Sequence, residues 1–168
     1  MNIFDDILSL KKAGFQGFRP IHVLRETRFE CVPDKTGVYV VVRNSDQPVT
    51  FLRRSPAGHF KGRDPTVPIE KLQSEWVEGT VTLYIGKAGG TEQNATIHKR
   101  IDAYIKFGSG QRVAHWGGRV VWQLEGSELF LICWKETPAN NSRTLEKNLI
   151  EQFKRTHGGR RPFANLRD

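Results

Sequence analysis

The spacing of apolar residues along the chain predicts two buried strands that each carry a tyrosine. Short β-branched runs bounded by turn residues occupy 37–42 and 81–85, and such runs are typical of strands buried in a sheet. Tyr39 lies in the first run and Tyr84 in the second. The second run leads into the turn 86–90, which is rich in glycine and contains Lys87. Glycine at a strand end permits a sharp turn or the approach of a ligand, although many proteins have such junctions without a site.

Helical spacing predicts helices over 2–13, 93–107 and 142–155. Asn2 is a candidate N-cap of the first helix, and Asn140, Asn141 and Ser142 are candidates for the last. Residues 15–35 follow neither period, so we expect irregular structure there. The alternating segments 119–124 and 128–135, which flank a glycine turn, predict a β-hairpin.

An insert, residues 43–80, separates the two tyrosine strands. Alternation over 49–61 around a Pro-Gly turn predicts a hairpin, and Ile69, Leu72 and Trp76 share one face of a helix that Gly79 can end. The insert is basic. Solvated decoration and contact with nucleic acid are both open interpretations of it.

Together these elements predict an α+β fold with a small, mainly antiparallel sheet flanked by helices. The 168 residues and 19.2 kDa fit a single domain with its own core. Residues 1–35 form an N-terminal extension of that domain, and 43–80 form its insert. The sequence has no internal repeat and no phosphate-loop or dinucleotide fingerprint.

The net charge of +8 and the pI near 9.8 predict attraction to polyanions. Nucleic acid is the leading partner, because phosphate neutralisation and counterion release supply much of its affinity for proteins. A basic protein without such a partner has the same composition.

The cysteine and hydropathy patterns argue against several other classes of protein. Cys31 and Cys133 belong to no closely spaced pair, which argues against a zinc site and a disulfide framework; we expect both to be reduced and partly buried. Asp5 and Asp6 occupy the position where a signal peptide is basic, and no apolar run approaches membrane-spanning length. We therefore expect a soluble, cytoplasmic protein that does not associate with membranes.

Two charged residues lie on or beside helix faces that should pack against the core. Arg100 flanks the apolar stripe of the helix 93–107, where it either reaches a site or extends to solvent from the core edge. Glu146 falls within the apolar face of the last helix. A carboxylate there is costly without a cation, a metal ion or a cleft, so either a structural pair with an arginine or a functional role is expected.

Taken in order, Gly37-Val38-Tyr39, Tyr84-Ile85-Gly86-Lys87, Arg100, Glu146 and Asn165 resemble the landmarks of the GIY-YIG endonuclease family. The chain's ending is similar to that of the GIY-YIG domain in the bacterial excision-repair incision subunit. The resemblance covers roughly 36–168 apart from the insert. The insert makes the connection between the tyrosine strands unusually long for the family, and the chain has no room for the separate DNA-binding domain that most relatives carry. Targeting would then come from the insert, the loop around Trp116 or a protein partner.

The resemblance implies metal-dependent hydrolysis of a phosphodiester bond in nucleic acid, with DNA as the expected substrate. Glu146 would hold one divalent ion, Mg²⁺ or Mn²⁺, and Lys87 and Arg100 would stabilise negative charge in the transition state. Tyr39 would act as general base or orient the attacking water, with Tyr84 as its neighbour. His98 is a rival proton acceptor. Asn165 completes the implied catalytic set.

Further cations and aromatic residues are candidates for nucleic-acid binding. They are Arg53, Arg54, Lys61, Arg63, Arg112, His115, Trp116, Arg160 and Arg161. Two alternatives to a nuclease remain at this point. One is a catalytically inactive nucleic-acid-binding module of the same fold, and the other is a basic structural protein in which Glu146 pairs with Arg100.

Overall fold

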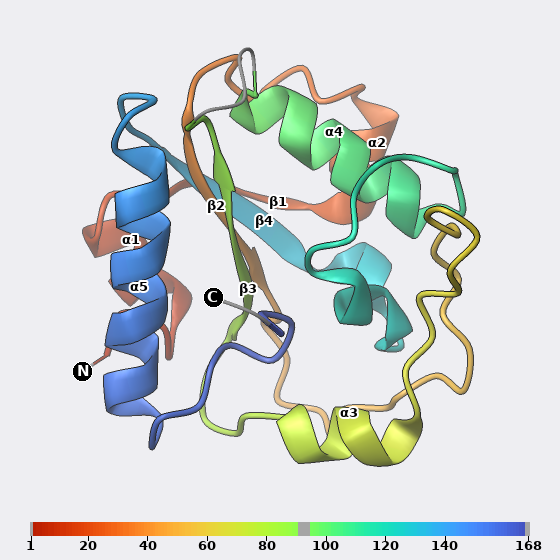
Figure 1. Cartoon of the computed structure of the whole chain (residues 1–168). Helices are drawn as coiled ribbons and strands as arrows, with labels where there is room; N and C mark the ends of the chain where they lie inside the picture. Colours follow the sequence, from red (N-terminus) through yellow and green to blue (C-terminus); the bar gives the residue numbers. More distant parts are fainter. Residues whose placement is uncertain (1, 91–94, 167–168) are drawn as a thin grey trace.

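The computed structural model describes residues 2–90 and 95–166 and shows an α+β protein with a four-stranded antiparallel sheet (Figure 1). The sheet order is β1-β4-β2-β3. Its strands are β1 Gln16–Pro20, β2 Gly37–Val42, β3 Thr82–Ala88 and β4 Leu131–Glu136. The α-helices are α1 Ile7–Lys12, α2 Ile21–Glu26, α3 Ile69–Glu75, α4 Ile97–Gly108 and α5 Ser142–Thr156, with 3-10 helices η1 Arg119–Gln123 and η2 Ser127–Leu129. The predicted class and the antiparallel sheet are confirmed.

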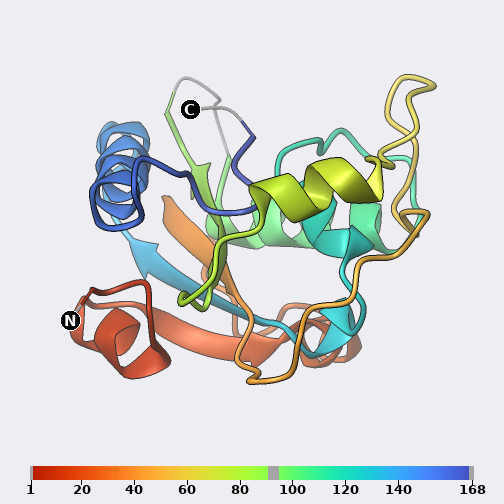
Figure 2. The ribbon, with the colours of Figure 1, turned by 90° about the horizontal axis from the view of Figure 1, so that it is seen from below.

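Strand β2 is buried at every position because helices cover both faces of the sheet (Figure 2). Val38, Val40 and Val42 pack in one core cluster with residues of α1 and α5. Tyr39 and Val41 point to the other side, into a cluster with α2, α4 and η1. Successive strand residues alternate between faces, so this continuous apolar run places Tyr39 on the α4 side.

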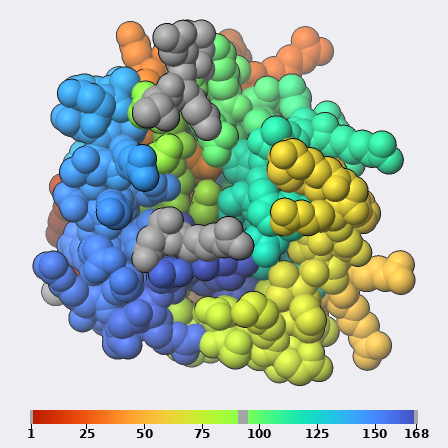
Figure 3. All heavy atoms as spheres, in the orientation of Figure 1, coloured from red at the N-terminus to blue at the C-terminus, as the bar shows by residue number. Residues whose placement is uncertain are grey.

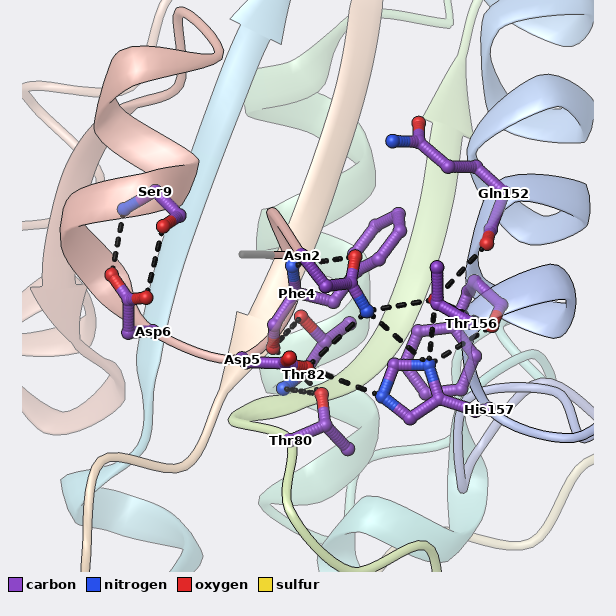
Figure 4. A network of polar contacts seen from close by, with 11 residues as sticks. Asn2, Phe4, Asp5, Asp6, Ser9, Thr80, Thr82, Gln152, Thr156 and His157 are labelled. Carbon is purple, nitrogen blue, oxygen red and sulfur yellow. Dashed lines mark hydrogen bonds and ion pairs between the residues drawn. The ribbon is translucent and has the colours of Figure 1, made fainter.

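The N-terminal segment differs from the predicted helix 2–13. Helix α1 begins only at Ile7, because Asp6 is its N-cap and accepts a 2.7 Å hydrogen bond from the Ser9 amide. Asn2 instead donates to the Thr156 hydroxyl at 2.7 Å (Figure 4). The hydroxyls of Thr80 and Thr82 donate to the Phe4 carbonyl. The segment therefore joins the start of β3 to the end of α5.

The expectation of irregular structure over 15–35 was wrong, because β1 and α2 lie there. Strand β1 is short and interrupted by a bulge between Gly17 and Arg19. The Trp134 ring of β4 lies across Gly17, where an added Cβ would be 2.5 Å from the ring. This strand forms by pairing with β4, which is distant in sequence. The residues of β1 therefore give no local signal that predicts it.

The predicted hairpin over 49–61 is also wrong. Phe51 forms a bridge with Leu124, and the Leu52 amide donates to the Gln123 carbonyl at 2.8 Å. The buried Gln123 side chain donates to the carbonyls of Leu52 and Val67 and accepts from the Val67 amide. The insert thus pairs with the η1 region, and its pairing with itself is limited to a bridge between Phe60 and Arg63. Its helix is present as α3 but ends at Glu75, before Gly79.

The predicted hairpin 119–135 has only its second strand, β4, which begins at Leu131. Residues 120–123 are buried in succession, which a strand with one solvated face does not allow, and they form η1. Gly118 and Gly126 adopt left-handed conformations before η1 and η2. Trp122 lies under Gly108, where a Cβ would be 2.3 Å from the indole.

Helices α4 and α5 lie close to their predicted ranges. The Thr96 side chain caps α4 by accepting from the Lys99 amide, while the predicted start at 93 lies outside the described residues. Asn141 precedes α5 without a side-chain cap bond. Cys133 is buried, but Cys31 is exposed rather than partly buried. Among the described residues, no helix has the length and apolar character needed to cross a membrane.

Candidate active site

The pairing of β2 with β3 brings the two motif tyrosines together. Tyr39 lies directly opposite Gly86 in the register. A Cβ on Gly86 would stand 2.4 Å from Cζ of Tyr39 and 2.6 Å from its hydroxyl oxygen, so only glycine leaves room for this ring. Tyr84 lies on the same face, with its ring centroid 6.0 Å from that of Tyr39. Gly86 was predicted to begin a turn but lies within β3, where the ring of Tyr39 requires a residue without a side chain.

Tyr39, Tyr84 and Tyr104 form a buried cluster on the α4 side of the sheet. Ring centroids of Tyr84 and Tyr104 are 5.7 Å apart, and the Tyr104 hydroxyl donates to the Gly118 carbonyl at 2.8 Å. Burial raises the pKa of each tyrosine. For Tyr39, the Arg100 charge offsets only part of this rise in pKa. All three hydroxyls are therefore neutral at pH 7.

A cavity of about 560 Å³ lies at the edge strand β3. Figure 3 shows the molecule hollowed between α5 on one side and the insert with the 109–118 loop on the other. The residues that line the cavity come from β3, α5, the insert, the loop after α4 and the C-terminal segment. They are Arg63, Tyr84, Lys87, Trp116, Gly117, Gly118, Arg119, Glu146, Ala164, Asn165 and Leu166. Four members of the implied catalytic set, from three widely separated parts of the chain, thus share one cavity, whereas Tyr39 and Arg100 do not line it.

Glu146 is half-buried on α5, in agreement with its predicted place on the apolar face. Burial raises its pKa, and the charges of Lys87, Arg100 and Arg143 oppose this. Lys87 projects toward the α5 side, because it pairs with Val38 in the register. Arg100 acts electrostatically on Glu146 as well as on Tyr39, so it links the two sides of β3.

No known protein family, curated protein or solved structure matches this chain.

Asn165 is buried, and its side-chain amide is bonded to the edge strand. The Ile85 amide donates to Oδ1 of Asn165 at 2.9 Å, and Nδ2 of Asn165 donates to the Ile85 carbonyl at 2.8 Å. The Ala164 amide donates to the Leu83 carbonyl. These bonds cover one part of the β3 edge, next to the part from which Lys87 projects. Asn165 therefore borders the cavity and also fixes the C-terminal segment.

The residues predicted to bind nucleic acid, apart from His115, separate into four groups. Arg63 and Trp116 line the cavity with Glu146, while Lys61 and Arg112 line a neighbouring cavity of about 610 Å³. Arg53 and Arg54 are exposed in the insert, away from both linings. Arg160 donates to the Ser74 carbonyl of α3 and Arg161 to the Leu166 carbonyl, so both hold the C-terminal segment.

The prediction that His115 lies on a binding surface is wrong. Its exposed fraction is 1%, and its ring is 4.9 Å from that of Tyr104. Burial lowers its pKa to about 3, with the Arg100 charge acting in the same direction. His115 is therefore neutral at pH 7 and supports the tyrosine cluster from within.

The sequence analysis did not include Arg119, Arg143 or Tyr104 among the site residues. Tyr104 could have been found, because it lies one helical turn after Arg100 on the same side of α4. Arg119 lies three residues after Trp116, a spacing that has no fixed meaning outside a helix. Arg143 precedes Glu146 by three positions in α5, which makes the two neighbours on the helix surface.

The residues present fit a weakly coordinated hard divalent ion rather than a closed metal cage. Among residues 2–90 and 95–166, no group of three or more His, Cys, Asp or Glu side chains could hold a metal. Mg²⁺ commonly binds through one or two carboxylates, substrate phosphates and water. Glu146 is the acidic residue in the cavity lining, and the surrounding cations favour its charged form.

Proposed function

We propose that the protein is a metal-dependent endonuclease that hydrolyses phosphodiester bonds of DNA through a GIY-YIG site. The observation that carries the proposal is the shared cavity. Tyr84, Lys87, Glu146 and Asn165 line it, although they come from a strand, a helix and the C-terminal segment. Tyr39 packs beneath it against Gly86.

Each charged residue of the site would have its own role in such a reaction. Glu146 would hold the divalent ion together with a phosphate oxygen of the substrate. A bound Mg²⁺ or Mn²⁺ supplies charge neutralisation at the phosphate and the leaving oxygen. Lys87 and Arg100 stabilise the negative charge that builds up in the transition state, and removing one such group typically costs about 10² to 10³ in rate.

Of the two roles open to Tyr39, its burial favours orienting the attacking water over acting as general base. Its pKa is raised by burial, so deprotonation at pH 7 is disfavoured. A neutral hydroxyl still donates or accepts a hydrogen bond to water. Tyr84, also neutral, reaches the cavity beside it.

Nicking of supercoiled plasmid tests the proposal directly. The wild-type protein is expected to nick with Mg²⁺ or Mn²⁺ and to stop when EDTA removes the metal. Binding without nicking under both metals would contradict the proposal and support the inactive nucleic-acid-binding module. Absence of both binding and nicking, on RNA as well as DNA, would support a structural role for the Glu146 and Arg100 charges.

A further inference from the structure

The wall of the cavity across from α5 holds two arginines against one aromatic ring. Cζ of Arg119 is 4.6 Å from the Trp116 ring centroid, and Cζ of Arg63 is 5.6 Å from it. The Trp116 ring also lies 6.2 Å from the rings of Phe60 and Phe107. Trp116 is partly buried among them, so its orientation is fixed by packing.

Arginines that lie against an aromatic ring are well suited to bind phosphate. The contact engages the face of the guanidinium group, while its N–H bonds point outward in the plane and match two oxygens of one phosphate. Because the ring already restricts the side chains, less conformational freedom is lost when a ligand binds. Phosphate is therefore the ligand chemistry that this wall favours.

The arginine pair is part of the same cavity as the candidate catalytic residues. Arg63 comes from the insert, and Trp116 and Arg119 come from the segment after α4. Lys87 and Glu146 line the same space, and Glu146 is the acidic member of the lining. The wall thus adds two arginine charges to the space that Lys87 and Glu146 also line.

We infer that Arg63 and Arg119, positioned by Trp116, bind a phosphate adjacent to the scissile one. The identity of the scissile phosphate rests on the proposed function. The substrate is then a polynucleotide strand held at two phosphates, rather than a mononucleotide or a small phosphodiester. The insert supplies part of this second phosphate site through Arg63, which gives the long connection between β2 and β3 a role in substrate binding.

Neutral phosphate substitution tests the inference. After the cleaved bond is mapped, DNA duplexes are made with an uncharged methylphosphonate at the neighbouring phosphate on either side. For wild type, one substitution is expected to raise KM about tenfold with little change in kcat. For Arg63→Gln and Arg119→Gln, KM is already raised, and the same substitution has little further effect. Equal sensitivity of wild type and both variants to every neutral linkage would overturn the inference.

Arg19→Gln is the matched control for the loss of one exposed arginine. Arg19 lies on β1, at the far edge of the sheet from β3. Its variant should keep the wild-type KM and the wild-type response to the methylphosphonate. A rise in KM equal to that of Arg63→Gln would mean that general surface charge, and not a phosphate site, sets affinity.

Trp116 variants separate positioning from folding. Trp116→Phe keeps an aromatic face and should retain most of the affinity, whereas Trp116→Leu should raise KM about as much as Arg63→Gln. Equal KM values for Trp116→Leu and wild type would contradict the positioning role. Thermal melts of both variants identify any loss caused by unfolding.

Direct binding keeps failure of this inference distinct from failure of the nuclease proposal. Fluorescence anisotropy of a labelled duplex in EDTA measures affinity without cleavage. Weaker binding by Arg63→Gln than by Arg19→Gln, in a protein that never cleaves, would support the phosphate site and contradict the nuclease. Cleavage with unchanged affinity in Arg63→Gln and Arg119→Gln would support the nuclease and overturn the phosphate site, and absence of all binding would overturn both.

Discussion

The two faces of the strand pair β2–β3 carry different polar groups, neutral hydroxyls on one face and charged side chains on the other. On the α4 side, Tyr39, Tyr84 and Tyr104 are buried and burial raises their pKa values, so they stay neutral. On the α5 side, Lys87 and Glu146 are half-buried, and nearby cations oppose the effect of burial on Glu146. The protein thus places neutral hydroxyls beneath a charged rim. In the proposed reaction, the rim and Arg100 of α4 stabilise charge, and the buried tyrosines orient groups.

Replacing Tyr39 tests this division. Among the buried tyrosines, its replacement should have the largest effect on kcat. Tyr39→Phe should lower kcat by about 10², the typical loss of one positioned hydrogen-bond donor, while the shape of the pH–rate profile stays that of wild type. Tyr104→Phe is the control, because the Tyr104 hydroxyl is already bonded to Gly118. This variant should be less stable than wild type, with little change in kcat. Disappearance of an inflection in the Tyr39→Phe profile would show that Tyr39 is the base.

Asn165 offers a second test, because it borders the charged rim but bonds to backbone. Asn165→Ala leaves the Ile85 amide and carbonyl without their side-chain partners, so the free energy of unfolding should fall by about 3 kcal/mol in urea titrations. Asn165→Asp can still accept from the Ile85 amide but cannot donate to the carbonyl. Its free energy of unfolding should therefore lie between those of wild type and Asn165→Ala. Loss of cleavage by Asn165→Ala without loss of stability would instead favour the catalytic role that the resemblance implies.

The pH dependence of stability tests the charged face, and the effect expected here is the smallest of the three. Because the folded-state pKa of Glu146 is raised above 4.5, the folded protein holds this proton more tightly than the unfolded chain. The Glu146 contribution to stability is therefore complete below pH 4.5 and is lost as the pH rises through the raised pKa. Glu146→Gln should have a higher melting temperature than wild type at pH 7, and the difference should shrink toward pH 4. A lower melting temperature at pH 7 would show that Glu146 is a stabilising partner of Arg100.

Local patterns predicted the elements that one segment determines by itself. Strands β2 and β3 are short apolar runs, and helices α4 and α5 have clear helical periods, which also placed Glu146 on the inner face of α5. Strand β1 and the η1 segment could not be predicted, because Gly17 is shaped by Trp134 and Gln123 bonds to the insert. Both depend on residues far away in the sequence.

The same distinction applies to the candidate site. The order of the tyrosines, Lys87, Arg100, Glu146 and Asn165 carried the resemblance, and four of these residues line one cavity. The burial of His115 and the approach of Arg119 to Trp116 could not be predicted, because loop residues have no period that fixes their direction. The arginine pair of the proposed second phosphate site therefore became visible only when the insert and the 109–118 loop were placed together.

The most direct test of the account is the cleavage rate of Glu146→Ala in Mg²⁺, measured beside its melting curve and its affinity for a DNA duplex. Removal of a half-buried carboxylate should leave the fold and the affinity intact, because Lys87, Arg63 and Arg119 remain in the cavity. We expect no nicking by this variant while wild type nicks and EDTA abolishes the wild-type activity. Nicking at the wild-type rate by a folded Glu146→Ala protein would contradict the account.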